Sequence, residues 1–159
     1  MKILIFFTIF SLLSACNSTG GKPPTYPEKP ISPYQQTLNK YKQRWQQANI
    51  NNYQYTFQRS CFCMRDYTKA VITTVKNNNV IDAHWKGSKK PLGDKFKNNQ
   101  QTINYFFAKI QDAIDKKAAV ITVKYNEQYG YPETLSIDYN KMIADEELWL
   151  SAKNFRKLK

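Results

Sequence analysis

The chain has 159 residues, a formal charge of +12, 42% hydrophobic residues, 14% aromatic residues and three cysteines. This length accommodates one domain rather than two. The aromatic share, with eleven tyrosines and nine phenylalanines, excludes an intrinsically disordered chain. Three cysteines cannot all pair with one another, so any disulfide leaves one thiol to be explained.

The N-terminal residues have the pattern of an export signal. Lys2 precedes an apolar run from Ile3 to Leu13, which is too short for a membrane-spanning helix because such a helix needs about 20 residues. Leu13-Ser14-Ala15-Cys16 resembles the lipobox of bacterial lipoproteins, in which the chain is cut before the cysteine and the thiol is alkylated by diacylglycerol. The resemblance implies a signal peptide over residues 1–15 and a covalent lipid on Cys16. The alternative is an ordinary signal peptide with a chance cysteine.

The residues after Cys16 predict a tether. Residues 16–33 hold five of the seven prolines, and proline favours extended conformers that bury little surface. In enteric-type bacteria an Asp after the lipidated cysteine retains a lipoprotein at the inner membrane. Asn17 stands there, so the resemblance implies the outer membrane, facing the periplasm. We expect residues 34–159 to form a single domain, with no cofactor besides the lipid.

The domain is expected to begin with a helix that ends near Ala48. In Ser32-Pro33-Tyr34-Gln35, Ser32 is placed as N-cap, Pro33 as first helical residue and Gln35 as partner in a capping box. The apolar positions after Ser32 recur at intervals of three and four residues, which puts them on one helix face: Tyr34, Leu38, Tyr41, Trp45 and Ala48.

Three strands are predicted next. Tyr53, Tyr55 and Phe57 alternate with polar residues, as in a half-buried strand. Residues 70–76 and 80–85 are β-rich, and Asn77-Asn78-Asn79 joins them, because asparagine tolerates the left-handed conformation of a tight hairpin. A lysine-rich loop is expected over residues 86–101.

The second half of the domain predicts another helix and more strands. Thr102 is placed to cap a helix with a strong apolar stripe: Ile103, Phe106, Phe107, Ile110 and Ile114. Strand patterns occupy residues 120–123 and 135–139, whereas residues 147–155 suit either a strand or a helix. The order α-β-β-β-α-β-β-(β) predicts an α+β domain, mainly an antiparallel sheet of five or six strands with two helices packed on one face.

Several short motifs occur together over residues from about 45 to 155: Tyr53-x-Tyr55, Arg59-x-Cys61-x-Cys63, Tyr125, Tyr129-Gly130-Tyr131-Pro132, Ile137-x-Tyr139 and Asp145-Glu146-Glu147. In this order, around an aromatic-rich second helix, they resemble a family of small secreted or lipid-anchored bacterial proteins known only as a domain of unknown function. The chain departs from the family at Asn126 and Glu146, where Asp is common. If those acids bind a cation in the family, the resemblance implies a weakened site here.

Cys61 and Cys63 are the sharpest candidates for chemistry. An oxidising compartment favours their pairing, but in an extended strand their Cα atoms would be about 6.6 Å apart, so a disulfide requires a turn or bulge. A structural disulfide, an unpaired buried pair, and a thiol redox or soft-metal site all stay open. Arg59 shares strand parity with both cysteines, and it would either lower a thiol pKa or pair with an acid such as Asp66.

Other residues offer weaker candidates. His84 is the single histidine and is expected to pack within a strand, and neither a nucleophile elbow nor a phosphate loop is present. The carboxylates fit neither a glycosidase nor a calcium template. Tyr129 and Tyr131 would form an exposed aromatic ledge for a glycan or peptide, or else pack the hairpin corner.

The positive charge is mostly lysine, with Lys89 and Lys90 at the centre of a basic loop. Export excludes nucleic acid as a partner and leaves anionic lipids or acidic envelope polymers, or simply a solvated surface. We therefore expect a membrane-anchored, non-enzymatic binding or accessory module of the bacterial envelope without a metal site. The alternative is a thiol redox or soft-metal-handling protein that uses Cys61 and Cys63.

Overall fold

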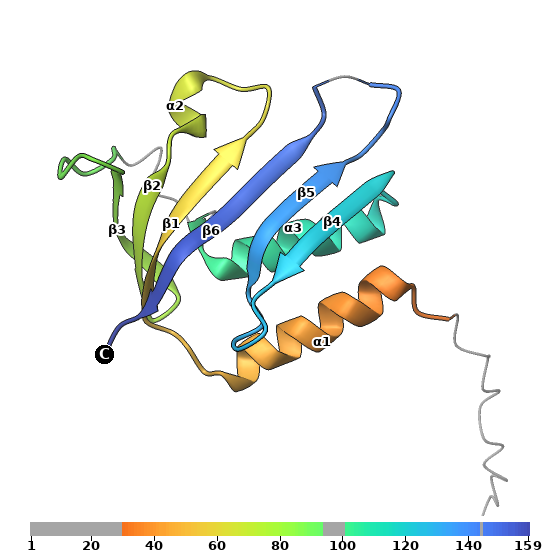
Figure 1. Ribbon diagram of the computed structural model, residues 1–159, viewed down its shortest axis with the longest axis horizontal. Coiled ribbons are helices and arrows are strands. Elements are labelled where there is room, and N and C mark those ends of the chain that lie inside the picture. Colours follow the sequence, from red (N-terminus) through yellow and green to blue (C-terminus); the bar gives the residue numbers. More distant parts are fainter. Residues whose placement is uncertain (1–29, 94–100, 144) are drawn as a thin grey trace, which may run out of the picture. The chain divides into compact units, whose positions relative to one another are not determined.

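The computed structural model describes residues 30–93, 101–143 and 145–159 (Figure 1). The predicted signal peptide, the predicted lipidation site at Cys16 and most of the predicted tether lie outside the described residues. Within the ranges described, no helix is both long enough and apolar enough to cross a membrane.

The described residues confirm the predicted α+β class and its element order. A long helix precedes three strands, and a second long helix precedes three more. The bounds are α1 Pro33–Gln47, β1 Tyr53–Ser60, α2 Arg65–Thr68, β2 Val71–Lys76, β3 Asn79–Trp85, α3 Ile103–Asp115, β4 Val120–Tyr125, β5 Pro132–Asp138 and β6 Leu148–Lys157. The segment that suited either a strand or a helix is the strand β6.

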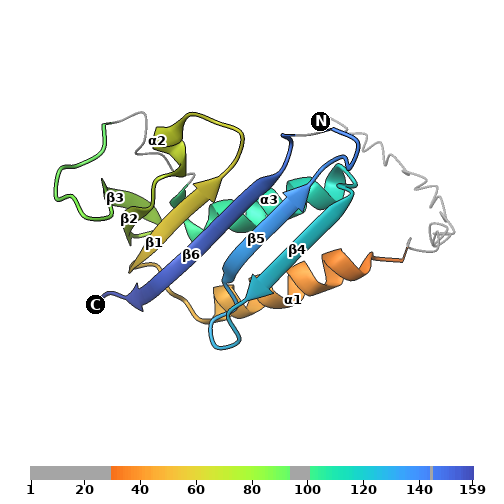
Figure 2. The same ribbon diagram turned by 45° about the horizontal axis from the view of Figure 1, so that its top comes forward.

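The six strands form one sheet in the order β3-β2-β1-β6-β5-β4, and every pair of neighbours is antiparallel. Two three-stranded meanders therefore meet at the central pair β1 and β6. Both α1 and α3 lie on the same face of this sheet (Figures 1 and 2). The opposite face, which we call the outer face, carries no long helix in the described part of the chain.

The core lies between the sheet and α3. Tyr53, Tyr55 and Phe57, the alternating residues of β1, point toward the helices and are at most 4% exposed. Phe106 of α3 contacts the rings of Tyr55 and Phe57 at centroid distances of 6.5 and 6.0 Å. The predicted apolar stripe of α3 is thus confirmed as the surface that packs against the sheet.

Two buried tyrosine hydroxyls fasten the N-terminus of α3 to β1. The Ile103 N–H donates to Tyr53 Oη at 3.0 Å, and Tyr55 Oη donates to the Gln101 carbonyl. Thr102 caps the helix as predicted, since its Oγ1 accepts from the Tyr105 N–H. The bonds from the Ile103 and Tyr105 N–H groups satisfy backbone donors that a helix N-terminus leaves without partners.

The asparagine hairpin between β2 and β3 is confirmed. Asn77 and Asn78 have φ values of 48° and 60°, in the left-handed region that asparagine tolerates.

Two details of the predicted helices are wrong, and one short helix was not predicted. Ser32 caps α1 through the Gln35 N–H, but the Gln35 side chain does not complete a capping box. Instead Gln35 and Gln111 of α3 exchange two amide hydrogen bonds of 3.0 and 2.8 Å. Tyr34 was predicted on the apolar face of α1 but is 52% exposed. Among the residues of α1 only Leu38 and Trp45 are buried. The single turn α2 was not expected, since four residues carry no helical periodicity.

Candidate functional site

The end of β1 carries a disulfide inside a tight turn. Cys61 and Cys63 are bonded, with 2.08 Å between their Sγ atoms and 5.3 Å between their Cα atoms. The Cys63 N–H donates to the Cys61 carbonyl at 2.9 Å. This turn brings the Cα atoms closer than an extended strand allows, which is the departure from strand geometry that the sequence required.

Arg59 lies two residues before this turn and binds a tyrosine. Its Nη2 donates to Tyr105 Oη of α3 at 2.9 Å, and its guanidinium lies 6.0 Å and 5.9 Å from the ring centroids of Phe57 and Tyr105. Asp66, the acid suggested as its partner, binds Lys69 at 2.7 Å. Burial raises the pKa of Tyr105 although Arg59 opposes the shift, so the hydroxyl stays protonated at neutral pH.

The disulfide turn is at the surface rather than under a helix. Phe62, between the two cysteines, is 82% exposed, and Met64 is 67% exposed. Cys63 is itself exposed, and Cys61 is partly exposed. The two cysteines are therefore at the surface and bonded, so the alternative of an unpaired buried pair is wrong.

The two tyrosines of the Tyr-Gly-Tyr-Pro motif have different surroundings. Tyr131 is 6% exposed and stacks on Phe155 at 4.4 Å between ring centroids, with Trp45 of α1 at 6.1 Å. Tyr129 is partly buried, and Lys157 Nζ lies 4.4 Å from its ring centroid. Tyr131 therefore packs the hairpin corner, whereas Tyr129 is partly buried beside the Phe155 ring and has a cation over its own ring.

Gly130 is where helix α1 rests on this hairpin. Its φ is +84°, and a Cβ atom at this position would lie 2.5 Å from the Tyr41 carbonyl oxygen and 2.9 Å from Arg44 Cβ. Glu127 adds polar contacts from the same turn, accepting from Tyr41 Oη at 2.7 Å and Arg44 Nη1 at 3.2 Å. The bond from Tyr41 lowers the pKa of Glu127. The Tyr-Gly-Tyr-Pro hairpin thus packs against α1.

Asn126, one of the two positions that the sequence resemblance singled out, organises the β4–β5 turn. Its Oδ1 accepts from the Tyr129 N–H at 2.8 Å, and its Nδ2 donates to Glu133 Oε1 at 3.0 Å. The bond from Asn126 is the main cause of the lowered pKa of Glu133, which also pairs with Lys124 at 3.1 Å. Within the described ranges, no three side chains of His, Cys, Asp or Glu are grouped to hold a metal ion.

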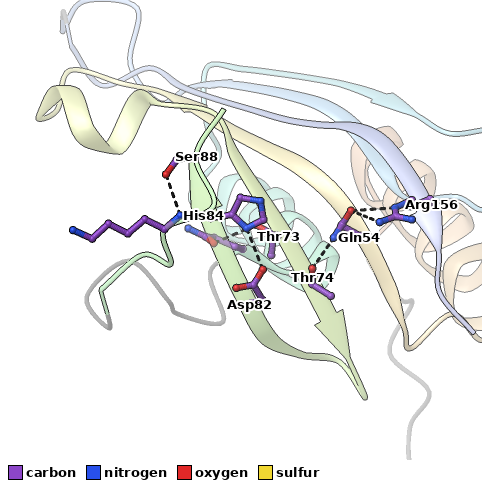
Figure 3. Close-up of polar contacts among 9 residues, drawn as sticks. Gln54, Thr73, Thr74, Asp82, His84, Ser88 and Arg156 are labelled. Carbon is purple, nitrogen blue, oxygen red and sulfur yellow. Dashed lines mark hydrogen bonds and ion pairs between the residues drawn. The ribbon is translucent and has the colours of Figure 1, made fainter. Parts of the chain in front are cut away.

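The outer face of the sheet carries a row of polar side chains (Figure 3). Gln54 of β1 accepts from Arg156 of β6 at 2.7 Å and donates to Thr74 Oγ1 of β2 at 2.8 Å. On β3, His84 Nδ1 lies 3.1 Å from Asp82 Oδ2. His84 therefore lies in a strand, as predicted, and the carboxylate of Asp82 beside it was not predicted.

The basic loop is pinned to the edge of the sheet. Lys89 and Lys90 are exposed, and the Lys90 N–H donates to Ser88 Oγ at 3.1 Å. The Leu92 N–H donates to the Ala83 carbonyl of β3 at 2.8 Å, which returns the chain to that strand. Lys89 and Lys90 therefore present exposed ammonium groups, whereas residues 94–100 of the predicted loop lie outside the described residues.

Two kinds of residue were missed at the sequence level. Tyr105 binds Arg59, but it lies outside the apolar stripe of its helix and had no local signal. Met142 is 93% exposed on the β5–β6 connection, and together with Phe62 and Met64 it is an apolar side chain that sequence hydropathy alone places in a core. Only the tertiary structure shows that these residues face solvent.

Comparisons with known proteins gave one finding. A family model described as a family of unknown function, DUF6174, matches residues 37–157. No curated protein and no solved structure matches the chain.

Proposed function

The chain belongs to the family of unknown function DUF6174, which assigns no activity, and we propose from the chain's own residues that it is a lipid-anchored protein of the bacterial envelope. The lipid is carried by Cys16, and the domain acts on a tether as a non-enzymatic binding or accessory module. The outer membrane, with the domain in the periplasm, is the proposed location.

The observation that best supports export is the Cys61–Cys63 disulfide. Disulfides persist in the periplasm and at cell surfaces, whereas reducing systems keep most cytosolic thiols free. The pairing also leaves Cys16 as the remaining cysteine, at the position that matches the lipobox. Two or three acyl chains on that residue would give stable membrane attachment, unlike a single short chain.

The anchor is tested by Cys16→Ser. We expect the wild-type protein to sediment with membranes and the variant to be released or to stay unprocessed, as shown by cell fractionation and intact mass. The matched control is Cys61→Ser/Cys63→Ser, which removes two cysteines and should leave the protein in the membrane fraction. A Cys16→Ser variant that is processed and still fractionates with membranes would show that the anchor is not on Cys16.

A second candidate function is thiol redox or soft-metal handling by Cys61 and Cys63. It is favoured by the exposure of the Cys61–Cys63 turn and by Arg59 two residues away, since cations stabilise thiolates. Thiol titration with mass spectrometry of the native protein tests it. Reduction by mild reductant, or copper retained after purification, would support this function. A bond that resists mild reductant, with no bound copper, would argue against it.

A further inference from the structure

Three connections leave the same end of the sheet. Neighbouring strands are antiparallel, so β1, β3 and β5 all run toward this end, which we call the leading end. The last residue of β1, Ser60, pairs with Trp149 near the start of β6, and Ile137 of β5 pairs with Leu148. The β1–α2 and β5–β6 connections therefore begin within two strand spacings of each other, and both views show them at one end of the sheet (Figures 1 and 2).

These two connections carry exposed apolar side chains, which we call the apolar tip. They are Phe62 (82% exposed), Met64 (67%), Met142 (93%) and Ile143 (46%). Single exposed apolar residues are normal on soluble proteins, but several gathered at one place mark an interaction surface. The described residues include only three other large apolar side chains this exposed: Ile31, Tyr34 and Ile81.

The disulfide constrains the turn that carries Phe62 of the apolar tip. Cys61 and Cys63 are bonded on either side of Phe62, so the backbone that carries this ring is held in a closed turn. A side chain presented by a constrained turn loses less conformational freedom when it binds than one on an open loop. The Cys61–Cys63 turn therefore lowers the conformational entropy that is lost when Phe62 contacts a partner.

Cations flank the apolar tip. Arg65 follows Met64 and Lys141 precedes Met142, and all of these residues are exposed. Lys89 and Lys90 lie on the connection that leaves β3 at the same end. Long basic side chains next to apolar ones suit a lipid interface, because the apolar groups enter the acyl boundary while the charges reach phosphate.

Acids are also present at the leading end. Asp145, Glu146 and Glu147 are exposed further along the β5–β6 connection, and Asp66 of α2 is bound to Lys69. These carboxylates oppose attraction to an anionic surface. The apolar side chains must therefore supply the part of the binding that salt does not screen.

We propose that the leading end docks onto a lipid bilayer, with the apolar tip inserted at the headgroup boundary and Arg65, Lys89, Lys90 and Lys141 directed to lipid phosphates. The inference rests on the proposed lipid anchor, because the anchor holds the domain beside a bilayer and makes a weak contact sufficient. The four apolar side chains are exposed, and a deformable lipid surface accommodates exposed side chains without a preformed pocket.

The test measures how deep single positions lie in lipid. The full-length mature protein is reconstituted into vesicles of phosphatidylcholine and phosphatidylglycerol, with an environment-sensitive fluorophore on Met142→Cys. With lipid on Cys16 and the Cys61–Cys63 bond intact, the introduced thiol is the only one to label. The matched control is Ile81→Cys on β3, which is 53% exposed and lies outside the apolar tip.

We expect a blue-shifted Met142 label that spin-labelled lipids quench, and an Ile81 label with the emission of an aqueous probe. Raising the salt concentration should leave most of the quenching, whereas Lys89→Ala/Lys90→Ala should weaken it at low salt only. Two labels that both report water would overturn the proposal. A Met142 label that is shielded but insensitive to the lipid quencher would also overturn it, in favour of contact with a second copy of the chain.

The docking of the leading end and the proposed anchor can be refuted independently of each other. Fractionation and the mass of the N-terminal residue report on the anchor, and the label reports on the leading end. If Cys16 carries no lipid, the same labels in a Cys16→Ser background are mixed with the vesicles at high lipid concentration. The difference between Met142 and Ile81 labels is then still the deciding observation.

Discussion

At position 130 the fold has room for a hydrogen atom and for nothing larger. Gly130 turns the β4–β5 hairpin with a φ of +84°, and the backbone of α1 lies against it. Trp45, one of the two buried residues of α1, contacts Tyr131 from the same hairpin and Tyr53 of β1. One glycine therefore determines how closely the first helix approaches the sheet.

Gly130→Ala should lower the free energy of unfolding by about 2–4 kcal/mol. Left-handed backbone strain accounts for about 1–2 kcal/mol of this loss, and overpacking against Tyr41 and Arg44 accounts for the rest. The measurement is urea denaturation followed by circular dichroism. Gly87→Ala is the matched control, because Gly87 has a φ of +89° and nothing within 4 Å of the added Cβ. Equal losses for the two variants would show that α1 does not rest on Gly130.

Residues whose structure depends on near neighbours were predictable. Asn77 and Asn78 take the left-handed conformation that their own side chains favour, and Thr102 caps the helix that follows it. The close packing of α1 on Gly130 was not predictable, because the contacting residues lie more than 80 positions earlier in the chain. The Cys61–Cys63 pair is an intermediate case. The sequence showed that a disulfide requires a turn, and only the structure shows that the turn is present.

At the scale of elements, the β1–α2 connection combines a covalent bond with little packing. It contains the Cys61–Cys63 turn and exposes Phe62 and Met64. A cross-link stabilises a protein mainly by restricting the unfolded chain, and the restriction grows with the length of the closed loop. The three-residue ring at this position restricts little of the chain, so its main effect is on the shape of the turn.

The double variant Cys61→Ser/Cys63→Ser should therefore lower the free energy of unfolding by only about 1–2 kcal/mol. Urea denaturation of the wild-type protein with and without a strong reductant should give the same difference. Phe62→Ala is the control, and an exposed side chain of this kind should change stability by less than about 0.5 kcal/mol. An unfolded double variant would contradict this account and would show that the bond holds the fold itself.

The long elements followed from periodicity, and the short one did not. α1, α3 and the strands β1 to β5 repeat apolar residues at helical or strand spacing over at least six residues, so their positions were predicted closely, whereas the pattern of β6 suited either a strand or a helix. α2 has four residues and no repeat to detect. The exposure of Tyr34 depends on where α1 ends its contact with the sheet, which no pattern within the helix encodes.

At the scale of the whole molecule, the two faces of the sheet differ in chemistry. The face toward α1 and α3 carries aromatic and aliphatic side chains, whereas the outer face carries the row that includes Thr74, Gln54 and Arg156 (Figure 3). Antiparallel sheets commonly have one packed and one solvated face. The apolar tip is the exception to this division, because it places apolar side chains in solvent at the end of the sheet.

The packed face makes stability sensitive to alkaline pH. Burial raises the pKa of Tyr53 to about 12 and that of Tyr131 to about 12, and it also raises the pKa of Tyr55. In the unfolded chain these hydroxyls ionise near pH 10. Below that pH both states keep the protons, so these tyrosines do not change the free energy of unfolding as pH varies.

Between pH 10 and pH 12 the unfolded chain releases protons that the folded protein retains, so the free energy of unfolding should fall as pH rises. The slope is about 1.4 kcal/mol per pH unit for each tyrosine, hence about 3 kcal/mol per unit for Tyr53 and Tyr131 together. Urea denaturation at pH 9, 10 and 11 measures it, and Tyr131→Phe should make the decline shallower by about the share of one tyrosine. A constant free energy of unfolding from pH 9 to 11 would mean that these hydroxyls are open to water in the folded protein.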